Sequence, residues 1–297
     1  MKKTKPLVSV IINCYNGDEY LSECLKSLEN QTYKNFEVIF WDNKSTDKSA
    51  LIYKKIKDKR FKYYLAKKNT TLYKARNLAL QKTKGKLIGF LDVDDLWLPS
   101  KIKKQISFFA DKEVGVVYSK LWILNEKTKE KKIHYKKELY SGYIHDRIVK
   151  NYNIGLVTTL VRKKTLINLK KLFDPKLTHM GDFDLFIRLS KICKFKAIQY
   201  PTAIYRVHSK MLTIKEKKEA LDEFEFWLKE NKKKLNLLGF KKLYISFLLR
   251  KFIFFKMNKN YYQCFKIILK SRNLQIIMKK ILILFLPLFF LKKLIWY

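Results

Sequence analysis

The stretch LIGFLDVDD, residues 87–95, says most about the fold of this 297-residue chain. It is an apolar run that ends in three carboxylates within four positions, and it predicts a buried strand. Carboxylates this close repel one another, and a divalent cation relieves that repulsion. Oxygen-only ligands suit Mg²⁺ or Mn²⁺. Because open α/β sheets bind ligands beyond the C-terminal ends of their strands, a metal there points to a phosphate-bearing ligand.

Strand and helix patterns alternate along the first 110 residues. Apolar runs predict strands, and apolar residues at helical spacing predict helices. The predicted strands are residues 7–12, 36–41, 61–65 and 87–91; the predicted helices are residues 19–31 and 72–81, with another beginning at Pro99. Residues 114–124 and 156–161 are further strand candidates. This alternation predicts an α/β fold with a mainly parallel, mixed sheet that is flanked by helices.

The composition indicates a folded and strongly basic protein. Hydrophobic residues make up 47% of the chain, which argues against disorder. The 65 Lys and Arg exceed the 26 Asp and Glu by 39, which is compatible with nucleic acid, anionic membrane or polyphosphate partners. Compositional drift is an equally open explanation of the charge. The four cysteines lack CxxC spacing, so we expect reduced thiols in a cytosolic protein.

The glycine pattern excludes two classes of nucleotide-binding protein. The eight glycines form neither GxGxxG nor GxxxxGK[ST], so the chain lacks the main signatures of a dinucleotide dehydrogenase and of a P-loop NTPase.

The C-terminal part of the chain differs from the rest, and we divide the chain into residues 1–210 and 211–297. From residue 231 onward there are 16 Lys and Arg and no Asp or Glu. The apolar run 281–291 is too short to span a bilayer, which takes about 20 residues. Its basic flanks and the terminal Trp296-Tyr297 suit a helix that lies among lipid headgroups. A basic helical bundle packed on the first domain is the alternative.

Five short motifs occur in order: VSVIINCYN (8–16), WDNKSTD (41–47), ARN (75–77), LDVDD (91–95) and GDFDL (181–185). Together they resemble the motifs of family 2 glycosyltransferases, and the resemblance covers roughly residues 6–210. It implies the GT-A fold and an inverting transfer of a sugar from a nucleotide-diphosphate donor, most commonly a UDP-sugar. The acceptor would be a hydroxyl of a glycan or of a lipid-linked molecule, in cell-envelope polysaccharide synthesis.

The resemblance assigns the donor-binding residues. Asn13 and Tyr15 would hold the nucleotide base, although ordinary turn chemistry also explains such an Asn. Asp42 would accept a hydrogen bond from the base; the alternative is a cap of the next helix. Arg76, near the start of a predicted helix, would reach the base or the diphosphate.

The same resemblance assigns the metal site. Asp92 would contact ribose and metal-bound water, and Asp94 would ligate the Mn²⁺ or Mg²⁺ that bridges the two phosphates. Asp95 is either a helix cap or a further metal contact. His208, in a late Arg-x-His element that we expect to follow a strand, is a candidate metal ligand or phosphate donor, and a structural role is the alternative.

The catalytic base is predicted at the GDFDL motif, which opens a helix. Asp182 would take the proton from the acceptor hydroxyl, and an N-cap role is the alternative. The family usually has an acid where this chain has Gly181, which removes a possible contact to the acceptor. We expect Asp184 to be an exposed or capping acid.

These observations predict a divalent-metal-dependent glycosyltransferase that is cytoplasmic and peripheral at the inner face of the cell membrane. Its partners would be a nucleotide sugar, a glycan or lipid-linked acceptor and an anionic membrane surface, with no nucleic acid. The alternatives are a basic nucleic-acid-binding protein and a membrane scaffold whose transferase domain is inactive.

Overall fold

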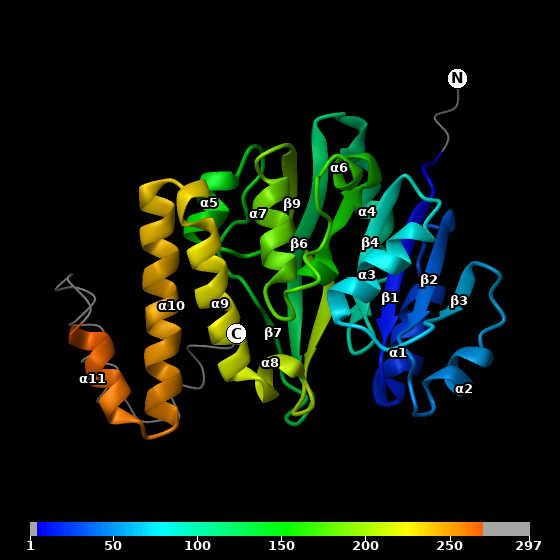
Figure 1. The fold of residues 1–297 in the computed structure, drawn as a ribbon. Coiled ribbons are helices and arrows are strands. Elements are labelled where there is room, and N and C mark those ends of the chain that lie inside the picture. The colour runs from blue at the N-terminus through cyan, green and yellow to red at the C-terminus, as the bar shows by residue number, and fades with distance from the viewer. Residues whose placement is uncertain (1–4, 270–297) are drawn as a thin grey trace. The chain divides into compact units, whose positions relative to one another are not determined.

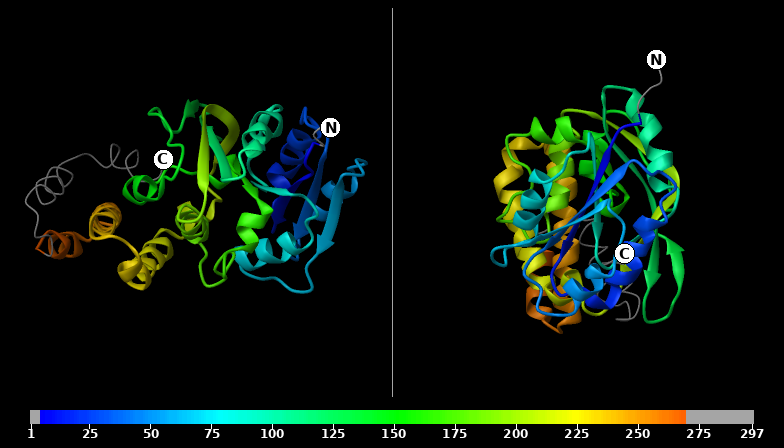
Figure 2. Two further views of the ribbon diagram at one scale, coloured as in Figure 1. Left: turned by 90° about the horizontal axis from the view of Figure 1, so that it is seen from above. Right: turned by 90° about the vertical axis from the view of Figure 1, so that its right-hand side faces the viewer.

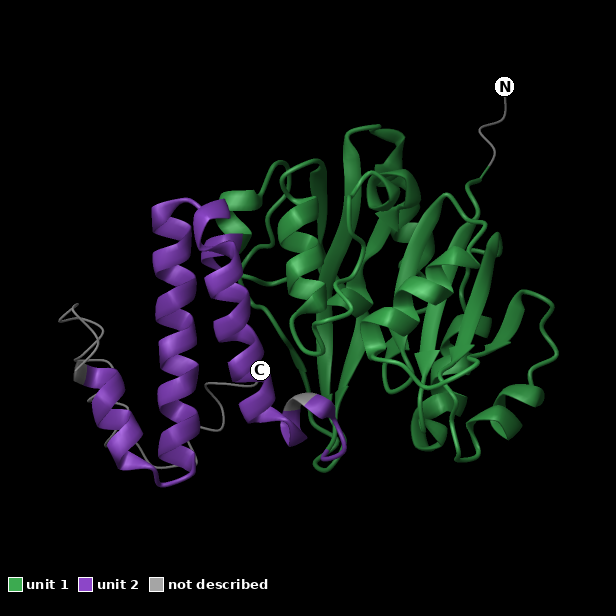
Figure 3. Cartoon of the chain, viewed as in Figure 1, with its two compact units in different colours: residues 1–148, 152–208 green, residues 149–151, 209–297 purple. Residues whose placement is uncertain are grey.

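The computed structural model describes residues 5–269. Its contacts divide the chain into two compact units (Figure 3): unit 1 comprises residues 1–148 and 152–208, and unit 2 comprises residues 149–151 and 209–297. The apolar run 281–291 and Trp296-Tyr297 lie outside the described residues.

Unit 1 is built on a sheet whose first half is parallel (Figure 1). Its neighbouring strands are β3 (Phe61–Leu65), β2 (Phe36–Asp42), β1 (Val8–Cys14) and β4 (Leu87–Asp92). Every residue of β1 and β2 is buried, as is expected where helices cover both faces of a sheet.

The second half of the sheet is mixed. It comprises β8 (Leu160–Arg162), β6 (Val114–Asn125), β9 (Lys194–Val207) and β5 (Leu96–Trp97), with β7 (Lys131–Ile133) paired to β6. β8 runs antiparallel to both β4 and β6, whereas β9 runs parallel to β6. The mainly parallel, mixed sheet flanked by helices that the sequence predicts is confirmed.

The helices of unit 1 cover the two faces of the sheet. They are α1 (Asp18–Glu29), α2 (Ser49–Lys54), α3 (Leu72–Gln81), α4 (Lys101–Ile106), α6 (Lys163–Ile167) and α7 (Gly181–Leu189); α5 (His145–Lys150) runs from unit 1 into unit 2, and Ser107–Ala110 form a 3₁₀ turn. α1 and α4 lie on one face, and α3 and α7 lie on the other (Figures 1 and 2). The chain reverses direction across the sheet after β3, so right-handed crossovers place α3 opposite α1.

One predicted strand is partly wrong. Residues 156–158 form a 3₁₀ turn, Leu156–Thr158, and the strand begins only at Leu160. The hydroxyls of Thr158 and Thr159 donate to the carbonyls of Gly155 and Leu156 at 2.7 and 2.8 Å. Such local bonds compete with strand pairing, which explains why an apolar run does not extend here.

All four cysteines are buried and none forms a disulfide. The reduced state and the cytosolic compartment expected from the sequence stay predictions.

Unit 2 is helical in its described part. It contains α8 (Leu212–Lys215), α9 (Lys217–Asn231), a 3₁₀ turn (Lys232–Lys234), α10 (Leu237–Met257) and α11 (Tyr261–Leu269). Phe224 of α9 packs edge-on against Phe247 of α10, with ring centroids 5.7 Å apart. Asn236 caps α10 by accepting the N–H of Gly239 at 2.7 Å. Within residues 5–269, no helix has the length and apolar character needed to cross a membrane.

Candidate active site

The strand register brings three of the predicted site residues to one edge of the sheet. Asn13 lies opposite Trp41 on one side and opposite Asp92 on the other, and Asp42 lies opposite Cys14. These positions are the carboxyl ends of β1, β2 and β4, where an open α/β sheet binds its ligands.

Asn13 has the properties of a ligand-binding side chain. It is 8% exposed, and neither its Oδ1 nor its Nδ2 has a hydrogen-bond partner within the described part of the chain. The Nε1 of its register neighbour Trp41 is also buried without a partner. Buried polar atoms are rarely left unpaired, so these three atoms are available to a ligand. Tyr15, in the loop after β1, is 55% exposed.

Asp42 is buried and already has two protein partners. Its Oδ1 accepts the N–H of Ser45 at 2.7 Å, and its Oδ2 accepts the hydroxyl of Tyr63 at 2.5 Å. Because α2 begins only at Ser49, Asp42 shapes the turn after β2 and does not cap that helix. A carboxylate oxygen has two lone pairs, so these bonds leave room for a ligand donor.

Asp92 and Arg76 form an ion pair, with Nη2 and Oδ1 2.5 Å apart. Arg76 is only 3% exposed, and its guanidinium lies over the ring of Tyr73, 5.2 Å from the centroid. The Asp92 side chain remains 37% exposed. Arg76 therefore extends from α3 to this edge of the sheet, where its guanidinium pairs with Asp92.

Asp94 and His208 form the second polar pair. His208 Nε2 lies 3.1 Å from Asp94 Oδ2, and His208 Nδ1 is buried without a partner among the residues described. The 3.1 Å separation suits a hydrogen bond, and it also matches the edge of an octahedron whose metal–ligand bonds are about 2.1 Å. Over residues 5–269 no group of three His, Cys, Asp or Glu could hold a metal. Asp94 and His208 would supply two ligands to an octahedral cation.

Asp95 does not cap the next helix, whose N-cap is Ser100, which corrects one of its two predicted roles. It is buried, and its Oδ1 accepts the backbone N–H of Arg206 at 2.9 Å, so it ties the loop after β4 to β9. Burial raises the pKa of Asp95 well above its ordinary value, and the neighbouring Asp94 and Asp92 charges raise it further.

Arg206 lies within β9, not after a strand as predicted. Its guanidinium donates to the carbonyl of Asp94 at 2.9 Å and to the carboxylates of Glu126 and Glu23 at 2.7 and 2.6 Å. It therefore holds the backbone of the Asp94 loop in place.

Asp182 lies in the first turn of α7, but it is not the N-cap, which is Met180. Its Oδ1 accepts the N–H of Phe183 at 2.8 Å and the hydroxyl of Tyr73 at 3.4 Å. Burial raises the pKa of Asp182; the Arg76 charge and the Phe183 N–H partly offset this rise, and Asp92 adds to it. A carboxylate with a raised pKa takes up a proton more readily than an ordinary one.

Asp184 is neither exposed nor a cap, which corrects the expectation from sequence. It is 8% exposed, and its Oδ2 accepts Arg188 Nε at 2.8 Å, one helical turn later. The remaining donors of Arg188 bond to the carbonyls of Lys171 and Leu172. Arg188 therefore links α7 to the preceding loop, and Asp184 orients Arg188.

Three tyrosines near the acids were not identified from the sequence. Burial and the charge of Asp182 raise the pKa values of Tyr73 and Tyr152. The pKa of Tyr205 is raised by burial and by the charges of Asp95, Asp94, Asp92 and Asp182. The hydroxyl of Tyr152 is buried and has no partner in the described part of the chain. Tyr73 precedes Arg76 by three residues, so helical spacing could have placed both on one face of α3. No local pattern marks the other two.

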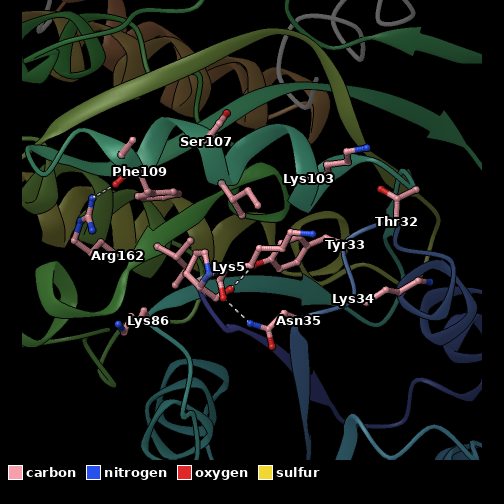
Figure 4. Close-up of a pocket in the computed structure, with 14 residues that line it drawn as sticks. Lys5, Thr32, Tyr33, Lys34, Asn35, Lys86, Lys103, Ser107, Phe109 and Arg162 are labelled. Atoms are coloured by element: carbon pink, nitrogen blue, oxygen red, sulfur yellow. Dashed lines mark hydrogen bonds between the residues drawn. The ribbon is translucent and has the colours of Figure 1, made fainter. Parts of the chain in front are cut away.

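A cavity of about 920 Å³ lies at the opposite edge of the sheet, where β1, β2 and β4 begin (Figure 4). None of the 14 described residues that line it is acidic, and its cations are Lys5, Lys34, Lys86, Lys103 and Arg162. Arg162 is held by the carbonyls of Phe109 and Asp111 at 3.0 Å. No predicted site residue lines this cavity.

Comparison with known proteins agrees with the resemblance inferred from the motifs. Residues 9–169, more than half of the chain, match the family described as Glycosyl transferase family 2. The Escherichia coli enzyme UDP-Glc:alpha-D-GlcNAc-diphosphoundecaprenol beta-1,3-glucosyltransferase WfaP is 32% identical over 72% of this chain and 83% of its own length.

Two solved structures share the fold. Staphylococcus aureus TarS in complex with UDP-GlcNAc has a TM-score of 0.64 at 20% identity, over 92% of this chain and 79% of that one. The mannosyltransferase PcManGT of Pyrobaculum calidifontis, in complex with GDP-Man and Mn²⁺, has a TM-score of 0.59 at 17% identity, over 77% and 65%.

The fold and the family match together define a glycosyltransferase with the GT-A fold. The chain belongs to glycosyl transferase family 2.

Proposed function

We propose that this chain is an inverting transferase that moves a sugar from a nucleotide-diphosphate donor to a hydroxyl of a glycan or lipid-linked acceptor. A UDP-sugar is the first candidate for the donor. The observation that carries the proposal is the gathering of Asp92 with Arg76, of Asp94 with His208, and of Asp182 with its raised pKa, close to the carboxyl ends of the parallel strands.

The donor nucleotide would lie across the ends of β1 and β2. The unpaired amide of Asn13 is suited to a base, whose edge offers both donors and acceptors, with Asp42 and Tyr15 beside it. Asp92 would contact the ribose. Arg76 would hold Asp92 in place and keep a positive charge near the diphosphate.

Asp182 would act as the base. Its carboxylate takes the proton of the acceptor hydroxyl as the acceptor oxygen bonds to the anomeric carbon from the face opposite the leaving group. The bond from that carbon to the donor phosphate oxygen breaks, and its electron pair leaves with the nucleoside diphosphate. One in-line displacement of this kind inverts the anomeric configuration.

A Mn²⁺ or Mg²⁺ ion would be held by Asp94 and His208. When bound, it would neutralise the negative charge that develops on the departing diphosphate. The 3.1 Å pair and the mannosyltransferase neighbour that is in complex with Mn²⁺ support this part of the proposal.

The acceptor class is proposed from relatives. WfaP is named for transfer of glucose from UDP-Glc to GlcNAc-diphosphoundecaprenol, and Bacillus subtilis TuaG, 31% identical, is named for teichuronic acid biosynthesis. We propose that this chain likewise serves cell-envelope polysaccharide synthesis.

We further propose that residues 1–210 are the transferase domain and that residues 211–297 hold it at the anionic inner face of the cell membrane. The 16 Lys and Arg without an acid after residue 231 support this role. The enzyme would then be cytoplasmic and peripheral.

A screen of nucleotide sugars with Mn²⁺ tests the donor and the metal. A ligand that binds only the folded state stabilises it by about 2.7 kcal/mol at a hundred times its Kd. We expect one nucleotide sugar to raise the melting temperature only when Mn²⁺ or Mg²⁺ is present. If calorimetry detects no uptake of either ion, with or without a nucleotide sugar, the metal-assisted proposal is wrong.

Sedimentation of the full chain with vesicles tests the membrane role. We expect binding to vesicles with anionic lipid and not to neutral ones. Lys241→Glu/Lys242→Glu, on exposed positions of α10, should weaken the binding, and Lys34→Glu/Lys103→Glu in unit 1 is the matched control. An equal effect of both pairs would contradict a specific role for the C-terminal region.

A further inference from the structure

Gly181 at the start of α7 is in close contact with the ring of Tyr73. A Cβ atom at position 181 would lie 2.4 to 2.6 Å from three ring carbons of Tyr73, which is closer than real contacts allow. The phenol of α3 therefore occupies the space that a side chain at position 181 would need. Glycine at 181 is required by the neighbouring ring and not by an unusual backbone angle.

The hydroxyl of Tyr73 contacts Asp182 twice. It accepts the backbone N–H of Asp182 at 3.3 Å and donates to the Oδ1 of the same residue at 3.4 Å. Both bonds are long, as catalytic hydrogen bonds often are before a substrate tightens them. Oδ1 also accepts the N–H of Phe183 at 2.8 Å. No hydrogen bond from the described residues reaches Oδ2.

The ring of Tyr73 is itself firmly held. It is 3% exposed and stacks on Phe173 with centroids 5.3 Å apart and an interplanar angle of 17°. The Arg76 guanidinium packs beside this stacked pair, 5.2 Å from the Tyr73 centroid and 5.8 Å from the Phe173 centroid. Phe173 is held in turn by Asn77, whose Oδ1 accepts its N–H at 3.1 Å and whose Nδ2 donates to its carbonyl at 2.8 Å.

We propose that Tyr73 is a positioning residue for Asp182, seated against Gly181 so that its hydroxyl holds Oδ1 and leaves Oδ2 open to the acceptor proton. The inference rests on the proposed function, because it assigns Tyr73 a part in setting the base of that same site. It explains why Gly181 stands beside the base, where a side chain would displace the phenol.

The groups that face Asp182 determine how Tyr73 affects it. Arg76 of α3 favours the charged form of Asp182, and Asp92 of β4 opposes it. The phenols of Tyr152 and Tyr205 lie near enough to interact with its charge. A hydrogen bond donated to a carboxylate favours the ionised form, so the Tyr73 hydroxyl makes Asp182 a base at lower pH than it otherwise would be.

Tyr73→Phe removes the hydroxyl and keeps the ring. We expect kcat to fall about tenfold with little change in KM, and the acidic limb of the kcat profile to move to higher pH. Tyr33→Phe is the matched control, because Tyr33 is equally buried but donates to the carbonyl of Pro6 at the other edge of the sheet. A Tyr73→Phe profile that coincides with the wild-type profile would contradict the positioning role.

Carbon-13 NMR titration of the aspartate carboxyls separates this inference from the proposed function. The Asp182 signal is assigned by its loss in Asp182→Asn, and we expect its pKa to rise in Tyr73→Phe. If no nucleotide sugar is turned over, the proposed function fails, yet the titration still decides whether Tyr73 acts on Asp182.

A double-mutant cycle tests the contact between Gly181 and the Tyr73 ring. Gly181→Ala should destabilise the wild type, because the new methyl group displaces the Tyr73 ring, and it should cost much less in a Tyr73→Ala background. The measurement is the free energy of unfolding by denaturant. An equal cost in both backgrounds would show that the ring does not determine the glycine.

Discussion

Glu37 at one end of the sheet and Asp95 and Asp182 near the other end are buried acids whose pKa values shift in opposite directions. Where the strands begin, the Glu37 carboxylate accepts Ser9 Oγ at 2.7 Å and both the Lys84 N–H and Lys62 Nζ at 2.6 Å. Burial acts to raise the pKa of Glu37, but these three donors outweigh burial and the net pKa is lowered. Where the strands end, burial and neighbouring carboxylates raise the pKa values of Asp95 and Asp182.

The difference separates an acid whose charge is compensated by its neighbours from acids whose charge is not. A net charge of +39 gives no guidance, because basic residues are found at both ends of the sheet. The number of hydrogen-bond donors around each carboxylate distinguishes the two kinds of acid. Glu37 accepts three hydrogen bonds, one of them from a Lys ammonium. The acids at the carboxyl end outnumber the cations among them, so a bound cation or a proton would stabilise them.

Asp182→Asn should have the largest effect. An amide cannot take the acceptor proton, so we expect transfer to fall by about 10³-fold while donor binding is nearly unchanged. The melting temperature should not fall, because at neutral pH the raised pKa means that the ionised group destabilises the fold.

Asp184→Asn is the matched control on the same helix. It loses the ion pair with Arg188, so the variant should melt earlier but keep the activity of its folded fraction. Equal losses of donor binding and transfer in Asp182→Asn would contradict its role as a base.

Asp94→Asn should have the next largest effect. Losing one charged ligand should lower transfer about 10²-fold and remove the Mn²⁺-dependent rise in melting temperature. Asp222→Asn, on an exposed position of α9, should leave both unchanged. Undiminished Mn²⁺ binding in Asp94→Asn would exclude this residue as a ligand.

Glu37→Gln should affect stability and not activity. We expect a loss of about 1.5 kcal/mol at neutral pH, discounted because Lys62 is 37% exposed at the side chain. Since the folded pKa is lowered, this stabilisation is complete above the ordinary glutamate pKa of about 4.3 and disappears as the pH falls through the folded value. Denaturant unfolding at pH 7 and pH 3.5 checks this, and an equal difference at both pH values would contradict it.

Lys34→Glu/Lys103→Glu should have the smallest effect. Both lysines are exposed at the basic cavity, and we expect stability to change by less than about 0.5 kcal/mol, with activity unchanged. A marked loss of activity would mean that the cavity end of the sheet also takes part in function.

The elements of the first 110 residues follow closely from the sequence. The strand Phe61–Leu65 and the helix Leu72–Gln81 begin and end where the apolar pattern predicts, because neighbouring residues determine local structure. Since parallel strands end at a common edge, the correct strand assignments are enough to bring Asn13, Asp42 and Asp92 together there.

What the sequence could not provide is the pairing of distant residues. Tyr73 contacts a residue 109 positions away, and Arg206 pairs with Glu23 across 183 positions. Only the folded chain brings these groups together. The pair of Asp184 and Arg188 is different, because its four-residue spacing on a helix could have been recognised.

The buried cysteines make the chain its own reporter of local opening. Burial raises the pKa values of all four thiols, that of Cys193 to about 12, so alkylating reagents should react only when the surrounding structure opens. Cys14, Cys24 and Cys193 lie in unit 1, and Cys264 lies in unit 2. Mass spectrometry of labelled peptides would thus time the opening of the two units separately within one native sample.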